Sequence, residues 1–163
     1  MKTYFTVMDS PIDPLTLISN GTAITGIYMQ KHSPAPEQSG KAERNDNLPI
    51  LLAAKHQLIE YFEGNRREFD LLMAPHGTEF QLVVWKELCN IPYGETISYG
   101  ELAKRIGNPN ASRAVGLANG ANPISVVVPC HRVIGANGKL TGYGGGLPRK
   151  EKLLALEAGL FRP

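Results

Sequence analysis

Two side chains with complementary chemistry lie next to each other at the end of an apolar segment, Pro123-Ile-Ser-Val-Val-Val-Pro-Cys-His-Arg-Val133. Cys130 carries a thiol, whose deprotonated form is a strong nucleophile, and His131 carries an imidazole that titrates near neutral pH. A thiolate is a softer and stronger nucleophile than a hydroxyl. The pair therefore indicates nucleophilic chemistry, provided that other residues support the base and form a pocket.

The length and composition of the chain place it among ordinary globular proteins. It has 163 residues, of which 42% are hydrophobic and 20% are charged, enough to bury a core in one domain or two small ones. No segment approaches the roughly 20 apolar residues of a membrane span. The first residues, MKTYFTVMDSP, alternate instead of forming a signal peptide. We therefore expect a cytoplasmic protein in which Cys89 and Cys130 stay reduced.

The charge is unevenly distributed along the chain, although the net charge is only +2. Residues 1–77 contain 7 basic and 9 acidic side chains, whereas residues 78–163 contain 10 basic and 6 acidic side chains. This difference predicts that a polyanion binds to the second half. A solvated surface accounts for so small an imbalance equally well.

The first half contains short β-rich segments followed by a helix. Strands are expected at residues 2–8, 14–20 and 22–29. Asn20-Gly21 is typical of a hairpin turn, and residues 30–47 are polar and aperiodic, which indicates a loop. Apolar residues at helical spacing predict a helix from Leu48 to Glu63. This unit shows no visible chemistry and no metal-ligand spacing.

The second half is mainly helical. Thr78-Glu-Phe-Gln81 is a capping box that opens a helix towards Pro92, and Ser98-Tyr-Gly-Glu101 is another, opening a helix that stops at Gly107. After a tight turn, Asn110 is the expected N-cap of a helix from Ala111 to about Asn119. Two short helices across such a turn are the outline of a helix-turn-helix, which many proteins without nucleic-acid ligands also share.

The second of these helices is unusually rich in small side chains. Ala111, Ala114, Gly116 and Ala118 are small, and Arg113 is the single long cation. A helix that reads bases in the major groove normally projects several long polar side chains. The small residues are compatible with two interpretations: tight packing against another helix, or insertion into a narrow groove with one arginine reaching inward.

These features together carry a family resemblance. The motifs are Pro129-Cys-His-Arg-Val133, Arg113-Ala-Val-Gly116, Asn122-Pro123 and Gly142-Tyr-Gly-Gly-Gly146. In this order and spacing they closely resemble the O6-alkylguanine-DNA alkyltransferases, also called methylated-DNA–protein-cysteine methyltransferases. The resemblance covers residues 78–163 and fades over residues 1–77. Relatives without activity carry tryptophan at the nucleophile position, whereas this chain keeps Cys130.

The resemblance implies both a fold and an activity. The fold class is α+β, with a small α/β N-terminal domain over residues 1–77 and a mainly helical C-terminal domain over residues 78–163, which holds the helix-turn-helix and the active site. The activity is DNA repair by irreversible transfer of an alkyl group from O6-alkylguanine, and from O4-alkylthymine, to Cys130 after base flipping. We expect one event per molecule, no cofactor, no metal, and a monomer whose partner is double-stranded DNA.

The resemblance also assigns roles to individual residues. His131 is the base, directly or through a water, and Glu157 of a final helix at about 148–158 is its partner. Asn122 braces the active-site turn against the recognition helix. Tyr99 crowds the target phosphate and donates to guanine N3. The backbone carbonyl of Val133 reads the guanine amino group.

Further assignments concern the DNA and the substrate pocket. Arg113 fills the gap left by the flipped nucleotide. The groove-facing surface of its helix is formed by Ala111, Ser112, Ala114 and Gly116. Tyr143, Gly144 and Gly145 form the wall that closes over the base. Lys150 is a supporting residue near this wall. Gly144 stands where family members often carry serine, a change that should cost little because the expected contact there is a backbone N–H.

Two other classes of protein remain open from the residues alone. A Cys–His hydrolase or acyltransferase would use the same Cys130, His131 and Glu157, but it would turn over many times. A DNA-binding regulator would need base-reading side chains, which the Ala111–Asn119 segment largely lacks. Cys89 is a lesser rival as nucleophile, since it lies late in an amphipathic helix and is expected in the core.

Overall fold

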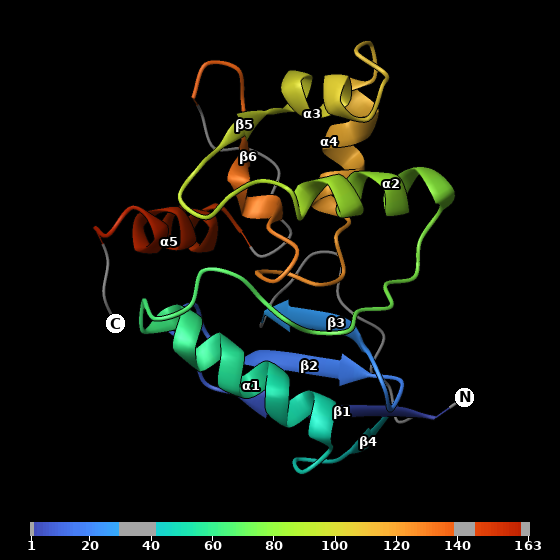
Figure 1. Cartoon of the computed structure of the whole chain (residues 1–163), viewed down its shortest axis with the longest axis vertical. Coiled ribbons are helices and arrows are strands. Elements are labelled where there is room, and N and C mark those ends of the chain that lie inside the picture. The colour runs from blue at the N-terminus through green and yellow to red at the C-terminus, as the bar shows by residue number, and fades with distance from the viewer. Residues whose placement is uncertain (1, 30–41, 139–145, 161–163) are drawn as a thin grey trace.

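The N-terminal part is a sheet with strand order β3-β2-β1-β4 and a helix against it (Figure 1). The computed structural model describes residues 2–29, 42–138 and 146–160. The elements of this part are β1 (Thr3–Met8), β2 (Leu15–Ser19), β3 (Ile24–Met29), β4 (Ala42–Arg44) and α1 (Pro49–Phe62). The first three strands pair antiparallel, and Gly21 in the predicted turn has φ +110°. Alternate side chains of β2 are buried, which gives the sheet its core face.

Strand β4 was not expected, because residues 30–47 were predicted to be a loop. It pairs in parallel with β1, and the amide of Asn45 continues the pairing by donating to the carbonyl of Phe5 at 2.9 Å. Its sequence, Ala-Glu-Arg, has no apolar alternation. The strand is defined by backbone hydrogen bonds at the edge of the sheet, so its side-chain pattern does not predict it.

The C-terminal part is mainly helical. Its elements are α2 (Glu79–Leu88), β5 (Ile97–Ser98), α3 (Tyr99–Arg105), α4 (Ser112–Gly120), the 3₁₀ turn η1 (Cys130–Arg132), β6 (Val133–Ile134) and α5 (Leu147–Glu157). The α+β class predicted from the sequence is confirmed. Strands β5 and β6 pair in parallel, with Ile97 opposite Val133. This pairing brings the segment after the Cys–His turn beside the start of α3.

The helix starts agree only in part with the predicted caps. Thr78 forms a complete capping box with Gln81. Ser98 accepts from the amide of Glu101, but the Glu101 carboxylate accepts from Arg105 instead of returning to the cap.

The predicted N-cap of the fourth helix was wrong. The N-cap of α4 is Ala111, which makes no side-chain hydrogen bond, and Asn110 lies outside the helix. Asn108 and Ala111 close the turn by a backbone hydrogen bond of 3.0 Å, so the tight turn extends one residue further than expected.

The two parts share one continuous hydrophobic core. The outer edge of β3 forms backbone hydrogen bonds with two later segments of the chain. The Ile24 amide donates to the Leu72 carbonyl at 2.8 Å, and the Ile27 amide donates to the Pro123 carbonyl at 2.9 Å. The Ser125 amide returns a bond of 3.2 Å to Ile27. The segment that leads to Cys130 is therefore fixed to the N-terminal sheet by its backbone.

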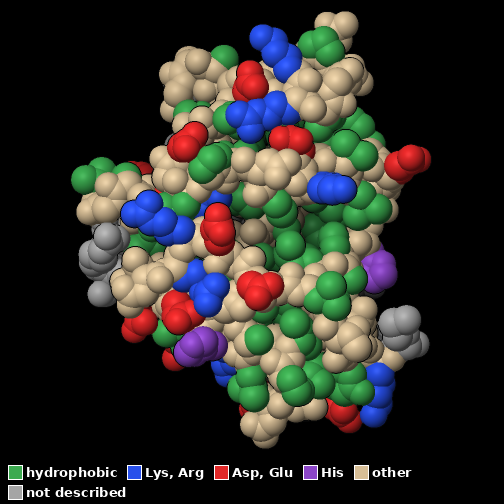
Figure 2. Space-filling model, in the orientation of Figure 1, with side chains coloured by type: hydrophobic (Ala, Val, Ile, Leu, Met, Phe, Trp, Pro, Cys, Tyr) green, Lys and Arg blue, Asp and Glu red, His purple; other side chains and the backbone are tan. Residues whose placement is uncertain are grey.

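The surface carries mixed charge on the face seen in Figure 2, where basic and acidic side chains lie next to one another. Within residues 2–29, 42–138 and 146–160, each helix is too short or too polar to cross a membrane.

Candidate active site

The apolar segment before Cys130 folds into a compact loop that its own polar residues hold in shape. The Asn122 side chain donates to the carbonyl of Val128 at 2.9 Å and accepts from the amide of Ile124 at 3.0 Å. Val126 has φ +72°, a conformation that valine rarely adopts. These bonds form the loop that presents Cys130 in the 3₁₀ turn, so Asn122 braces the loop internally.

A second asparagine links this turn to α4. The Asn119 side chain on α4 is fully buried and donates to the carbonyl of Cys130 at 3.2 Å. The Asn122 backbone amide also donates to the carbonyl of Asn119 at 3.3 Å, so Asn122 lies between the end of α4 and the active-site loop, and its role as a brace stays a prediction. The signal for Asn119 was weak: it is a polar residue on the buried side of a helix of small side chains.

Cys130 is buried, with only 4% of its surface exposed. Burial raises its pKa to about 11, although a hydrogen bond from the Asn122 side chain and the positive charge of Lys150 act in the opposite direction. The thiol is therefore protonated at neutral pH, and a neighbouring base must remove its proton before it attacks.

His131 has the properties of such a base. Its ring is completely buried, and Nε2 lies 2.7 Å from Oε2 of Glu157. Burial lowers the pKa of His131, against the opposing charge of Glu157, so the ring is neutral at pH 7. Because a carboxylate only accepts, Nε2 carries the proton and Nδ1 carries the lone pair. Nδ1 has no hydrogen-bond partner within the described parts of the chain.

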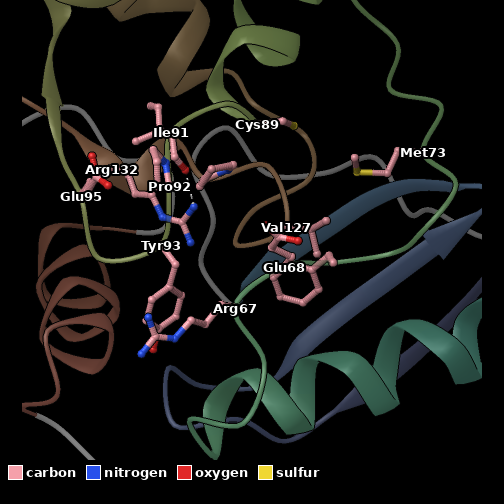
Figure 3. Close-up of a pocket in the computed structure, with 12 residues that line it drawn as sticks. Arg67, Glu68, Met73, Cys89, Ile91, Pro92, Tyr93, Glu95, Val127 and Arg132 are labelled. Carbon is pink, nitrogen blue, oxygen red and sulfur yellow. Dashed lines mark hydrogen bonds between the residues drawn. The ribbon is translucent and has the colours of Figure 1, made fainter.

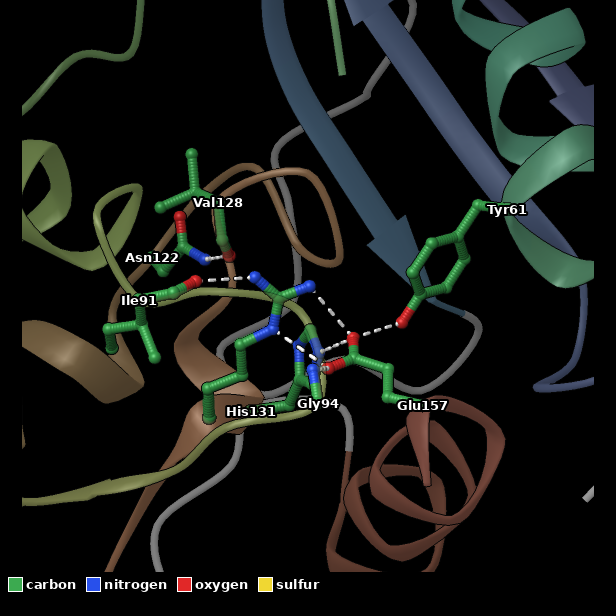
Figure 4. Close-up of polar contacts among 8 residues, drawn as sticks. Tyr61, Ile91, Gly94, Asn122, Val128, His131 and Glu157 are labelled. Atoms are coloured by element: carbon green, nitrogen blue, oxygen red, sulfur yellow. Dashed lines mark hydrogen bonds and ion pairs between the residues drawn. The ribbon is translucent and has the colours of Figure 1, made fainter. Parts of the chain in front are cut away.

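Glu157 is the centre of a buried polar cluster (Figure 4). Arg132 donates to it twice, from Nε to Oε1 at 2.8 Å and from Nη2 to Oε2 at 2.9 Å. The Gly94 amide donates to Oε1 at 3.1 Å, and the Tyr61 hydroxyl donates to Oε2 at 2.5 Å. Burial alone would raise the pKa of Glu157, but His131 and Arg132 hold it well below its ordinary range.

Two members of this cluster were missed by the sequence reasoning. Arg132 is 5% exposed and also donates to the carbonyl of Ile91 at 2.7 Å, although a lysine or arginine after a Cys–His pair would normally be placed at the surface. Tyr61 belongs to α1, in the part for which no chemistry was expected. Its hydroxyl nevertheless reaches Glu157, a contact that its sequence did not indicate.

Lys150 and Val133 are in direct contact. Lys150 is fully buried, and its ammonium donates to the carbonyl of Val133 at 2.6 Å. Burial lowers the pKa of Lys150 to about 8. The carbonyl predicted to read the guanine amino group is thus already an acceptor, although a carbonyl oxygen has a second lone pair to offer.

The outer surface of α4 presents the residues expected to contact DNA. Its exposed side chains are Ser112, Arg113, Ala114 and Leu117. In the described residues, no hydrogen bond or ion pair engages the Arg113 guanidinium. A Cβ at Gly116 would lie 3.7 Å from the Tyr99 ring, an ordinary contact, so packing inside the protein does not require glycine there. Ala111 is partly buried at the start of the helix.

Cys89 is exposed and lines a cavity of about 540 Å³ on the Arg132 side of the active-site turn (Figure 3). Its predicted place in the core was wrong, because it caps the end of α2, beyond the buried residues Trp85 and Leu88. The described lining includes Pro129 and Arg132 but not Cys130. The other predicted wall residues, Tyr143, Gly144 and Gly145, lie outside the described residues.

The fold and the buried thiol, imidazole and carboxylate are typical of a protein with a cysteine nucleophile. Comparison with known proteins agrees. The family model of the 6-O-methylguanine DNA methyltransferase, ribonuclease-like domain matches residues 3–75, and that of the 6-O-methylguanine DNA methyltransferase, DNA binding domain matches residues 79–159. The chain belongs to the 6-O-methylguanine DNA methyltransferase family.

Individual relatives cover nearly the whole chain. A methylated-DNA–protein-cysteine methyltransferase of Mycolicibacterium paratuberculosis is 54% identical over 94% of this chain and 91% of the relative. One of Methanosarcina acetivorans is 51% identical over 94% of this chain and 97% of the relative. Among solved structures, Mycobacterium tuberculosis OGT in complex with DNA superposes with a TM-score of 0.90 at 49% identity, covering 98% of this chain and 95% of that one.

Proposed function

We propose that this protein repairs DNA by moving an alkyl group from O6 of guanine, and from O4 of thymine, onto Cys130. The observation that carries the proposal is the buried Cys130 thiol next to His131, a neutral imidazole held by Glu157 at 2.7 Å. The relatives named methylated-DNA–protein-cysteine methyltransferase support the same reaction. We place it in the cytoplasm, where both free cysteines stay reduced.

The reaction begins with proton transfer. The Cys130 proton moves to Nδ1 of His131, directly or through a water, and the Glu157 carboxylate stabilises the imidazolium that forms. The thiolate then attacks the alkyl carbon, the new S–C bond forms, and the electron pair of the C–O6 bond leaves with the guanine. The guanine takes up one proton, for which the Tyr99 hydroxyl at guanine N3 is the proposed donor, and the tyrosinate then regains a proton from solvent while the His131 imidazolium releases its proton to solvent.

The product explains why the protein acts once. A thioether has no carbonyl group that water can attack, so nothing restores the thiol, and one molecule is consumed for each lesion. The displacement needs no cofactor, because the thiol supplies the electron pair and His131 accepts the proton.

Access to a base inside a duplex requires that the nucleotide leave the stack. We propose that α3 and α4 act as a helix-turn-helix, with α4 as the helix that enters the groove. Its exposed surface is narrow at Ala114 and carries Arg113 without a partner in the described part of the protein, which supports a role for this arginine in the gap left by the flipped nucleotide. Residues 78–163 then carry the chemistry, and residues 1–77 support it.

The test is transfer from a labelled lesion. Duplex DNA with a labelled methyl group on guanine O6 is incubated with the protein, and the label is located by peptide mass mapping. We expect one label per molecule, on Cys130, with no further release. Repeated turnover would instead indicate a hydrolase or acyltransferase, and binding without transfer would indicate a regulator.

Substitution of Arg113 by alanine tests the flipping step. Unstacking a base costs a few kcal/mol, so Arg113→Ala should slow repair of duplex DNA partially, by about 10-fold, and leave reaction with free O6-benzylguanine nearly unchanged. Rates on the two substrates are measured side by side. Ala114→Leu should instead weaken binding to all duplexes, because the added bulk keeps α4 out of the groove.

The salt dependence of binding provides the control for Arg113. If the arginine only contacts a phosphate, Arg113→Ala reduces the slope of log affinity against log salt by about one phosphate's contribution. Equal slowing on duplex and free base would contradict the flipping role.

A further inference from the structure

The Tyr61 hydroxyl donates to Oε2 of Glu157 at 2.5 Å, and Oε2 is the same oxygen that accepts from His131 at 2.7 Å. Both side chains are fully buried, and Tyr61 reaches the site from α1 across a sequence separation of 96 residues. The other oxygen, Oε1, accepts only from Arg132 and the Gly94 amide among the described residues. The oxygen that supports the base is thus shared, and one of its donors comes from the N-terminal part.

We propose that Tyr61 is a positioning residue that sets how strongly Glu157 supports His131, so that the N-terminal part adjusts the reactivity of Cys130. This inference rests on the proposed function of His131 as the base. The Glu157 carboxylate does not need Tyr61 to stay in place, because Arg132 donates to both of its oxygens and the Gly94 amide donates to Oε1. What Tyr61 adds is a hydrogen bond that draws charge away from Oε2.

The charged groups around His131 and Glu157 determine how the Tyr61 hydrogen bond acts on the base. The titratable and charged groups facing His131 and Glu157 are Tyr61 from α1, Tyr93 from the segment before Gly94, Cys130 and Arg132 from η1, and Lys150 from α5. With His131 neutral, Glu157 is the negative group of this cluster, and Arg132 and Lys150 are its positive groups. Proton transfer from Cys130 creates a negative thiolate on Cys130 and a buried positive charge on His131, and Oε2 of Glu157 lies 2.7 Å from the Nε2 atom of that ring.

Removal of the Tyr61 hydroxyl leaves more negative charge on Oε2. The imidazolium of His131 is then better stabilised, so His131 accepts a proton more readily and the Cys130 thiolate forms at lower pH. Burial, together with the charge of Glu157, raises the pKa of Tyr61 well above its ordinary value, so the hydroxyl remains a donor throughout the range in which His131 titrates.

The test compares Tyr61→Phe with the unchanged chain in a Cys89→Ser background. NMR titration of His131, which is one of four histidines, should show protonation at higher pH in Tyr61→Phe. Alkylation of Cys130 by iodoacetamide is followed by peptide mapping. At pH values below the midpoint of the alkylation profile, the rate should be about two- to threefold higher in Tyr61→Phe than in the unchanged chain, which corresponds to one modest hydrogen bond.

Leu58→Val is the matched control, because Leu58 is fully buried on α1 one turn before Tyr61. It should lower the temperature of unfolding and leave both pH profiles unchanged. An unchanged His131 titration in Tyr61→Phe, or a shift to lower pH, would overturn the proposal. Neither readout uses DNA, so failure here is distinguishable from failure of the proposed repair reaction, which is judged by methyl transfer to Cys130.

Discussion

Replacing Cys130 with serine should abolish alkyl transfer while the protein still binds damaged duplex DNA. A hydroxyl keeps the shape of the site, but it is a far weaker nucleophile than a thiol and its proton is harder to remove. The change is conservative for packing, because serine fills almost the same volume as the buried cysteine. The loss should exceed about 1,000-fold, measured as label transferred per molecule over time.

Cys89 provides the control within the same chain. Cys89 is exposed at the end of α2, whereas Cys130 is buried in η1. Cys89→Ser should therefore transfer the alkyl group at a near-normal rate. Label found on Cys89 in the unchanged protein would exclude Cys130 as the sole acceptor.

Replacing Glu157 with glutamine should have the second-largest effect, on both rate and stability. The amide cannot neutralise Arg132, whose guanidinium is buried, and removal of one partner from a buried ion pair costs about 3 kcal/mol or more. The imidazolium of His131 loses its negative partner, so transfer should slow by about 100-fold and rise only at higher pH. The pH dependence of Cys130 alkylation measures this shift, and an unchanged profile would remove Glu157 from the mechanism.

The stability effect has a defined pH dependence. The pKa of Glu157 is held below its ordinary range in the folded state, so its contribution is fully present above the pKa of an unfolded glutamate and is lost as the pH falls below it. Urea unfolding should therefore separate the unchanged protein from Glu157→Gln clearly at pH 7 and by a smaller margin at pH 3, because the loss is complete only below the folded-state pKa. A constant difference across this range would contradict the ionised state of Glu157.

The parts of the fold that depend on local sequence were predictable. Hydrophobic periodicity indicated α1 and the first three strands, and the Thr78–Gln81 capping box marked the start of α2. Strand β4 was missed because only backbone pairing with β1 defines it. The exposed position of Cys89 was missed because a one-residue difference at a helix end decides which side the side chain faces.

The site was predictable only where the family motif named its residues. Cys130 and His131 are adjacent in sequence, but Glu157 resembles an ordinary surface glutamate of a helix until the fold buries it. Tyr61 and Asn119 had no motif to mark them. Their roles arise from contacts across distant segments, Tyr61 with Glu157 and Asn119 with the carbonyl of Cys130, and such contacts leave no periodic signal.

The pairing of β3 with residues 123–125 has a consequence for how the chain avoids association with other chains. An open strand edge is a template for other chains, and its exposure leads to aggregation. Here the backbone of Pro123 and Ser125 occupies that edge through bonds to Ile27. The segment that leads to Cys130 thus also closes the Ile27 part of this edge, so a change that displaces residues 123–125 should expose backbone groups to other chains and favour aggregation.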